Sequence, residues 1–404
     1  MKDLLSFEFK KIITKKACFY IIIAAVLMNL FFFFVTDLRS ESYSMLDHEY
    51  KGIEAIAKEK SNVKEFTGEL TDEKIAKIHK EISLILDNPK NYVTEIDKNK
   101  QNLIDETKID MEAIGYTQHA IDDEIKSLKL ESEIWDKDYQ KYVSIHELID
   151  SKLINSDGTL IPIAKAFPTL EQPLIYDYHT GYDRLIRSLT NWVAILLCII
   201  VIVCISPVFA DEYGTGTDAV ILTTRYGKNK VVSAKIISSI LFSITIFVGF
   251  ALLNTCLYGF TYGLSGGNVS VFLDFWSSGK GYALTYFQQY IAALILGLLG
   301  TLFLTAITLL LSSKLKTAFS SIIMAALIAF IPAFDIFKIT IPLKKIFDFF
   351  PINIMSITSS FNRITNYNFF GTNIYQPYVM LAVALIGTVV LMPFAYRGFS
   401  RHQV

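Results

Sequence analysis

The strongest constraint on this chain is a series of long apolar runs that contain no charged residue. The first covers residues 17–35 and includes four consecutive phenylalanines. A helix needs about 20 apolar residues to cross the hydrocarbon core of a bilayer, so this run is long enough to span a membrane. Comparable runs follow at 192–210, 236–262, 290–311, 318–334 and 378–395. Together they predict an integral membrane protein with six spanning helices.

The first run has one alternative interpretation, a signal peptide that is cleaved after export. Signal peptides have a shorter apolar core and are followed by a small-x-small cleavage site. The run at 17–35 is longer than such a core and no such site follows it. We therefore expect an uncleaved membrane anchor.

Charge is unevenly distributed along the chain. Residues 36–187 hold 31 of the 39 acidic residues but only 20 of the 38 basic ones, a formal net charge of −11 in a chain whose total is −1. Within this segment Ile75, Ile78, Ile82 and Ile85 repeat at helical spacing after Thr71, a suitable N-cap. No strand-like alternation of any length is present. We predict a water-facing helical insertion that packs as a small bundle or a hairpin arm.

The predicted fold class is an all-α membrane protein with six transmembrane helices, an N-terminal amphipathic helix and a large helical extracellular insertion. In chain order the predicted segments are an interfacial helix 1–16, span 17–35, insertion 36–191, span 192–210, cytoplasmic loop 211–235, span 236–262, outer loop 263–289, span 290–311, cytoplasmic loop 312–317, span 318–334, outer or re-entrant helices 335–377, span 378–395 and cytoplasmic tail 396–404.

The side of the membrane is predicted by the lysines and arginines of the short loops, which favour the cytoplasm. Basic residues cluster in the N-terminal segment, in 211–235, in 312–317 and in the C-terminal tail. All four fall on one side if both termini are cytoplasmic. The segment 335–377 also carries basic residues but would lie outside. Because its prolines interrupt apolar residues, we expect short interfacial or re-entrant helices there.

The N-terminal segment 1–16 has the pattern of a helix that lies in the lipid headgroup layer. Phe9 and Ile12 fall on an apolar face, while Lys10 and Lys11 belong to a basic one. Such a face is attracted to anionic lipids. We expect Phe9, Lys10, Lys11 and Ile12 to anchor this helix at the interface.

Residues for catalysis or cofactor binding are not recognisable in the sequence. The Gly-Lys pair at Gly279 and Lys280 lacks the other residues of a phosphate-binding loop. The six histidines show no metal-ligand spacing, so solvated helix faces are the favoured interpretation, and all four cysteines lie in apolar runs. We expect no enzyme activity, no bound cofactor or metal and no nucleic-acid partner for this chain itself.

The segment after the second span is the most informative part of the sequence. Gly214 and Gly216 permit a sharp turn, Thr217 can cap a helix, and Asp218 suits its positive first turn. A short helix ending near Arg225 follows, and Gly227 can take the left-handed terminating position. We interpret this short helix as a rigid element on the cytoplasmic face through which force can be applied to the two spans that flank it. The alternative is an ordinary interfacial loop helix.

The residue pattern of this segment resembles the exit from the second span in ABC-2 type ABC-transporter permeases, especially bacterial members with a large insertion after span one. The residues that carry the resemblance are Phe209, Glu212, Gly216, Thr217, Leu222, Arg225, Gly227, Lys228 and Lys235.

The resemblance implies that this chain is the permease subunit of a bacterial plasma-membrane exporter. A separate ABC ATPase would bind ATP and Mg²⁺, and a second permease half, identical or not, would complete the pathway. The short helix around 217–225 would be a coupling helix seated in a groove of the ATPase, and the ATPase-coupling residues would be Glu212, Gly216, Thr217, Asp218, Leu222 and Arg225. The phenylalanine-rich spans lack charged residues, which favours an amphipathic substrate, either a peptide or a lipid-like molecule.

A second interpretation keeps the same architecture without transport. The complex could act as a signalling or mechanotransmission device whose extracellular domain binds a peptide or partner protein. A receptor with a cytoplasmic output domain is disfavoured, because the longest predicted inner loop has about 25 residues.

Overall fold

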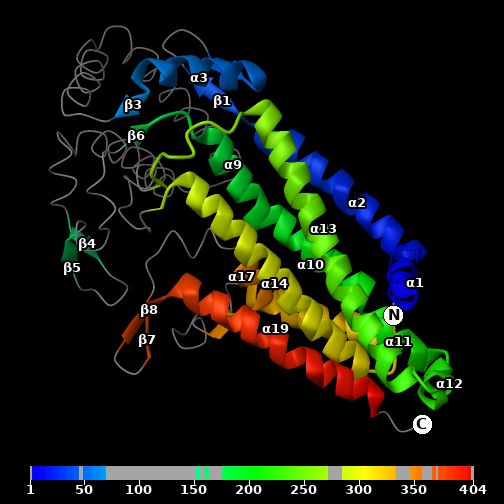
Figure 1. Ribbon diagram of the computed structural model, residues 1–404. Helices are drawn as coiled ribbons and strands as arrows, with labels where there is room; N and C mark the ends of the chain where they lie inside the picture. The colour runs from blue at the N-terminus through cyan, green and yellow to red at the C-terminus, as the bar shows by residue number, and fades with distance from the viewer. Residues whose placement is uncertain are drawn as a thin grey trace, which may run out of the picture. The chain divides into compact units, whose positions relative to one another are not determined.

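The computed structural model describes residues 2–44, 49–69, 152–154, 160–162, 175–271, 284–333, 346–356, 366–369 and 372–401 (Figure 1). These belong to two compact units. The first comprises Met1–Glu41, Tyr178–Phe272 and Lys280–Val404, and the second comprises Ser42–Asp177 and Leu273–Gly279.

The first unit is a helical bundle. Its elements are α1 (Lys2–Ile13), α2 (Lys16–Phe32) with the π-helical turn η1 (Phe33–Leu38), α9 (Thr180–Ser188), η3 (Leu189–Val193), α10 (Ala194–Ile205), α11 (Pro207–Gly214), α12 (Thr217–Thr223), η4 (Gly227–Val231), α13 (Val232–Thr261), α14 (Tyr286–Lys314), α15 (Ala318–Phe330), η6 (Ile331–Ala333), α17 (Pro351–Met355), β7 (Asn366–Phe369), β8 (Thr372–Tyr375) and α19 (Gln376–Ser400).

Five stretches of the described residues are long and apolar enough to cross a membrane. They are Lys16–Leu38, Thr180–Gly214, Gly227–Thr261, Tyr286–Lys314 and Gln376–Ser400. The predicted span 318–334 is not confirmed: α15 has 13 residues, about 20 Å at 1.5 Å per residue, against a core of about 30 Å. The turn η6 continues α15 as far as Ala333, and residues 334–345 lie outside the described part of the chain.

The second spanning helix begins earlier than the sequence predicted. It extends back to Thr180, through a segment that was assigned to the insertion because α9 contains Asp183, Arg184 and Arg187. Arg184 pairs with Glu41 at 3.0 Å, and the hydroxyl of Tyr262 donates a hydrogen bond of 3.1 Å to the same carboxylate. Paired charges can be buried at a helix end, so charge alone was a poor boundary signal.

Helix α14 lies inside the bundle and packs against α10, α13, α15, α17 and α19 (Figure 1). Two glycines permit close approach. A methyl group on Gly300 would come within 2.5 Å of Met355 of α17, and one on Gly387 of α19 would come within 2.4 Å of Phe303. Small residues at helix contacts are the usual means of tight packing in membranes, where lipid competes for apolar surface.

Polar side chains in the middle of the helices mostly pair within the protein. The hydroxyls of Ser243 on α13 and Thr305 on α14 lie 2.7 Å apart, and Asn254 contacts Ser188 of α9 at 3.2 Å. Thr308 donates to the carbonyl of Leu304 in its own helix. The first two contacts join different helices, whereas the third lies within α14.

The stretch 335–377, predicted as outer or re-entrant helices, contains both helix and strand. It contains the five-residue helix α17, but β7 and β8 form an antiparallel hairpin that pairs Asn366 with Tyr375 and Phe369 with Thr372. The prediction missed this hairpin because its two strands have only four residues each, too few to show a clear alternation. The basic residues of this stretch, Lys338, Lys344, Lys345 and Arg363, lie outside the described residues.

The second unit contains one described helix and three short strand pairs. These are α3 (Ile53–Phe66), β1 (Ser42–Ser44) with β2 (Glu49–Lys51), β3 (Gly68–Glu69) with β6 (Ile175–Tyr176), and β4 (Lys152–Ile154) with β5 (Leu160–Pro162). The expectation of an insertion without strands was therefore wrong. The predicted helical repeats at 75–85 lie outside the described residues.

Candidate coupling site

The chain reverses sharply between α11 and α12. Helix α11 begins at Pro207, directly after α10, and ends at Gly214. Gly216 has a φ of +67°, in the left-handed region that glycine adopts at little cost, and α12 begins at the next residue. The predicted cap, Thr217, is the first residue of α12. Its hydroxyl donates a 2.9 Å hydrogen bond to the Glu212 carboxylate instead of capping the helix.

The predicted role of Gly227 was also wrong. This residue is not in the left-handed conformation, and it begins the turn η4. A Cβ atom at this position would lie 1.6 Å from the carbonyl oxygen of Ile221 in α12. Gly227 is therefore required for close packing of two backbone segments, which joins the end of α12 to the start of the next spanning stretch.

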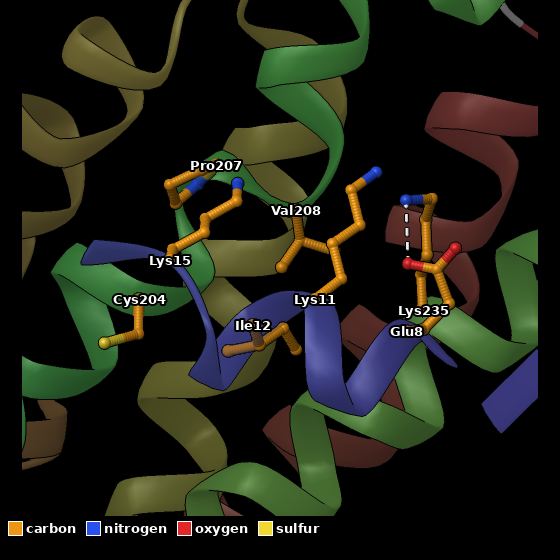
Figure 2. Close-up of a pocket in the computed structure, with 8 residues that line it drawn as sticks. All are labelled: Glu8, Lys11, Ile12, Lys15, Cys204, Pro207, Val208 and Lys235. Atoms are coloured by element: carbon orange, nitrogen blue, oxygen red, sulfur yellow. Dashed lines mark hydrogen bonds and ion pairs between the residues drawn. The ribbon is translucent and has the colours of Figure 1, made fainter. Parts of the chain in front are cut away.

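A network of four charged side chains lies beside this reversal, and we call it the inner ionic cluster: Glu8, Lys11, Glu212 and Lys235. Lys235 of α13 donates to Glu212 at 2.8 Å and to Glu8 of α1 at 3.1 Å. Lys11 donates to the same Glu212 oxygen at 2.6 Å. Figure 2 shows Glu8 and Lys235 side by side, with Lys11 on the adjoining turn of α1. The cluster thus connects α1, α11 and α13.

Three members of the cluster are almost completely removed from solvent. The side chains of Lys235, Glu212 and Glu8 are 1%, 4% and 8% exposed. Isolated buried charges are strongly unfavourable, so each must keep its partners. At Lys11, which is less buried, partial burial lowers the pKa, but the hydrogen bond and charge of Glu212 outweigh it and raise the pKa above its ordinary value.

The N-terminal helix α1 is held by protein as well as by any lipid. Lys15 forms a 2.7 Å ion pair with Asp211 of α11, and the hydroxyl of Ser238 on α13 donates to the carbonyl of Leu5. Of the four residues predicted to anchor it, Ile12 is buried and Phe9 is half-buried in the bundle core, while Lys10 is exposed. Lys11 faces Glu212 instead of the expected headgroups.

Buried contacts therefore attach the short helix α12 to the membrane-spanning stretches on either side of it. A comparison with protein-family models matches residues 17–392 to the ABC-2 family transporter proteins. The chain belongs to the ABC-2 transporter family. A comparison with curated proteins finds no match.

Membership places this chain as a transmembrane permease subunit of an ABC transporter. Proteins of this family are membrane subunits that are generally not catalytic, and they imply an ABC ATPase as partner. The multi-pass membrane location follows from the family together with the five apolar stretches. Among the described residues of this ABC-2 permease, no group of three or more His, Cys, Asp and Glu side chains could hold a metal ion.

The predicted coupling residues divide into two groups in this ABC-2 permease. Glu212, Asp218 and Leu222 are buried, with the last two only 7% and 5% exposed. Gly216, Thr217 and Arg225 lie at the surface. Buried members attach α12 to the bundle, and only exposed members are available for direct contact with another protein.

Sequence reasoning missed two exposed apolar residues at α12. Val220 is 67% exposed and Tyr226 is 48% exposed. Two cations lie over the Tyr226 ring: Lys230 is 4.1 Å from its centre and Arg225 is 5.4 Å from it. The exposure of Val220 could have been suspected, because it lies on the opposite side of a short helix from the buried Leu222 and Asp218.

Of the five histidines that the sequence placed in the insertion, His179 is within the described part of the chain. Its ring stacks on Tyr286 with 4.8 Å between centroids. The others, His48, His79, His119 and His146, lie outside the described residues.

Proposed function

We propose that this ABC-2 permease exports an amphipathic molecule, either a peptide or a lipid-like compound, and is driven by ATP hydrolysis in a separate ATPase. The observation that supports the proposal is the way in which α12 is attached to the bundle. One face of this short helix is exposed at Val220, while the buried Asp218 and Leu222 and the bonded Thr217 hold it on the bundle. We assign α12 as the coupling helix that the ATPase contacts.

The route of force follows the chain. Helix α12 is preceded by the continuous stretch Thr180–Gly214 and followed by Gly227–Thr261. Glu212 belongs to the first stretch and Lys235 to the second, and they are directly bonded. Displacement of α12 by the ATPase would therefore move two spanning helices together, which is rigid-body motion of packed elements.

The basic surface beside α12 supports a protein partner of opposite charge. Arg225, Lys228 and Lys230 are all exposed there, next to the apolar Val220 and Tyr226. An apolar centre with a charged rim is typical of protein contacts. We propose an ATPase groove with an apolar floor and acidic edges as the surface that receives it.

This assignment orients the protein. The end of the bundle that carries α1, α11 and α12 would face the cytoplasm of a bacterial cell, and the insertion would face outward. A second permease half would complete a pathway between the two copies. ATP and Mg²⁺ would be bound by the ATPase chains.

The support for an amphipathic substrate is the chemistry of the spanning stretches. The charged residues described in these stretches lie towards their ends, including those in α9 and in the inner ionic cluster. Between them the interior polar groups include hydroxyls and amides such as Thr305 and Asn254, which contact other parts of the bundle. Carriers of bare ions ordinarily place charged or coordinating groups at mid-membrane. A substrate with a large apolar part suits this interior better.

The test is reconstitution with the ATPase that co-purifies. Val220→Asp places a charge on the exposed face of α12, and Thr14→Asp places one on an exposed residue just after α1 as a matched control. We expect Val220→Asp to reduce ATPase co-purification and ATP-dependent substrate movement at least tenfold, and Thr14→Asp to preserve both. Equal behaviour of the two variants would refute the assignment of α12. ATP hydrolysis without movement of any amphipathic substrate would instead favour the mechanotransmission function.

A further inference from the structure

The helical stretch that leads to α12 is interrupted one element earlier, at the junction of α10 and α11. Helix α10 ends at Ile205, and α11 begins at Pro207. Proline has no N–H group, so the series of i→i−4 hydrogen bonds is broken at this residue. Helices bend sharply at such breaks and where a side chain from elsewhere inserts into the series. The group that occupies the break therefore determines how firmly α11 is held.

A serine of α14 occupies this break. The hydroxyl oxygen of Ser312 accepts hydrogen bonds from the amide of Phe209 at 3.0 Å and from that of Ala210 at 3.1 Å. The same hydroxyl donates a 2.6 Å hydrogen bond to the carbonyl of Ser206. Ser312 is 0% exposed, so water cannot readily replace it as the partner of these groups. One side chain, 103 positions from Phe209 in sequence, thus bonds the backbone on both sides of Pro207.

The other end of α11 is attached to the same part of α14. The hydroxyl of Tyr213 donates a 2.9 Å hydrogen bond to the carbonyl of Ser313. This is one of the last carbonyls of α14, which have no N–H partner in their own helix. Phe399 of α19 packs on both aromatic rings of α11, with 4.8 Å between ring centres for Phe209 and 5.4 Å for Tyr213. Consecutive residues of α14 therefore hold both turns of α11.

We propose that Ser312 is the positioning residue that fixes α11 to α14, so that displacement of α12 is passed to α14 as well as to α10 and α13. The inference rests on the proposed role of α12 as the coupling helix. Helix α12 follows α11 after two residues, and α14 packs against most of the other helices of the bundle. Three hydrogen bonds to one hydroxyl resist both rotation and sliding of α11 against α14. Without them α11 would turn about Pro207, and the motion would remain in the two stretches that flank α12.

The alternative is a purely structural helix cap, which would affect stability but not the passage of motion to α14. Ser312→Ala removes the hydroxyl. Ser313→Ala is a matched control, because the Ser313 hydroxyl donates to Leu310 in its own helix and the carbonyl that Tyr213 contacts is retained. Ser206→Ala is a second control. It keeps the carbonyl that Ser312 contacts, and its buried hydroxyl has no hydrogen-bond partner among the described residues.

The first measurement is amide hydrogen exchange of the full-length permease in detergent, without an ATPase. Ser312→Ala should make the start of α11, in peptides covering 206–214, exchange about tenfold faster, because local opening there loses three hydrogen bonds. Ser313→Ala and Ser206→Ala should leave this exchange within about twofold of the unsubstituted protein. Equal exchange in Ser312→Ala and the two controls would overturn the proposal.

The second measurement uses the complex with the ATPase that co-purifies, and compares the nucleotide-free state with the state trapped by ADP and vanadate. In the unsubstituted protein, trapping should change the exchange of α12 and of the end of α14, in peptides covering 308–316. In Ser312→Ala the change at α12 should remain, and that at α14 should fall about threefold or more. Ser313→Ala should retain both changes. A purely structural cap would leave the α14 response intact.

Tyr213→Phe decides the matter if Ser312→Ala fails to fold. It keeps the ring that packs on Phe399 and removes the hydrogen bond to Ser313, so a smaller loss of the α14 response is expected. An undiminished α14 response in these variants, or no α14 response in the unsubstituted protein when α12 does respond, would overturn this inference alone. No response at α12 in the unsubstituted complex would refute the coupling-helix assignment, and this inference with it.

Discussion

Lys235 and Glu212 form a 2.8 Å ion pair in which both side chains are at most 4% exposed. Lys235 belongs to the start of α13 and Glu212 to the end of α11, so the pair closes the loop that contains α12. Glu8 and Lys11 of α1 complete the cluster with one further charge of each sign. Helix α12 is therefore attached to the bundle electrostatically at its base, and Val220 on its outer face is left exposed.

Replacing Lys235 with Met should destabilise the protein by about 3–5 kcal/mol, because two buried carboxylates would retain only Lys11 between them. Thermal unfolding of the purified protein in detergent measures this. The double variant Lys235→Met/Glu212→Gln should recover part of the loss, since one of the uncompensated charges is also removed. A double variant as unstable as the sum of the single ones would contradict coupling between these residues.

Replacing Gly227 with Ala should destabilise the protein by about 1–3 kcal/mol or more, because the added methyl group meets a backbone carbonyl that cannot move aside easily. Gly249 in α13 is the matched control, since nothing lies within 4 Å of an added Cβ there. Gly249→Ala should raise stability slightly, by up to about 1 kcal/mol, because alanine favours the helix. Comparable unfolding temperatures for the two variants would refute the packing role of Gly227.

At Gly216 the expected effect is conformational. A Cβ there meets no atom within 4 Å, but the φ of +67° is unfavourable for alanine by about 1–2 kcal/mol. Asparagine tolerates this conformation better, so Gly216→Asn should be closer to the unsubstituted protein than Gly216→Ala. Unfolding temperature and ATPase co-purification should follow the same order. If alanine performs as well as glycine, the left-handed turn is not needed at this position.

The contribution of Lys11 to the stability of the folded protein should decrease at alkaline pH. Its pKa is raised above 10.5 by Glu212, so the folded state holds this proton more tightly than the unfolded chain does. The stabilisation is therefore fully present at neutral pH and is lost as pH rises through the raised pKa. The difference in unfolding temperature between the unsubstituted protein and Lys11→Met should be constant from about pH 6 to 9 and shrink at more alkaline pH. A difference that grows at alkaline pH would contradict this assignment.

Much of the architecture could be predicted from local sequence. A run such as 17–35 excludes water-soluble packing by its length and lack of charge, whatever its neighbours are. The break at Gly214 and Gly216, and the short helix after it, were likewise predictable because turn and helix preferences act over a few residues. The early start of the second span at Thr180 was not predictable, because Arg184 is accommodated there by Glu41, a residue 143 positions away.

The sequence by itself determined most of the segments that are apolar enough to cross a membrane, and where a short helix interrupts them, because these depend on local apolar content and backbone preference. Only the tertiary structure decided that Lys11 and Lys235 share the Glu212 carboxylate. The lysines of α1 match a lipid-facing helix equally well in sequence, since charge pattern identifies a polar face but not the group opposite it. Helix packing decides which group faces each lysine, because it places residues about 200 positions apart within hydrogen-bond distance.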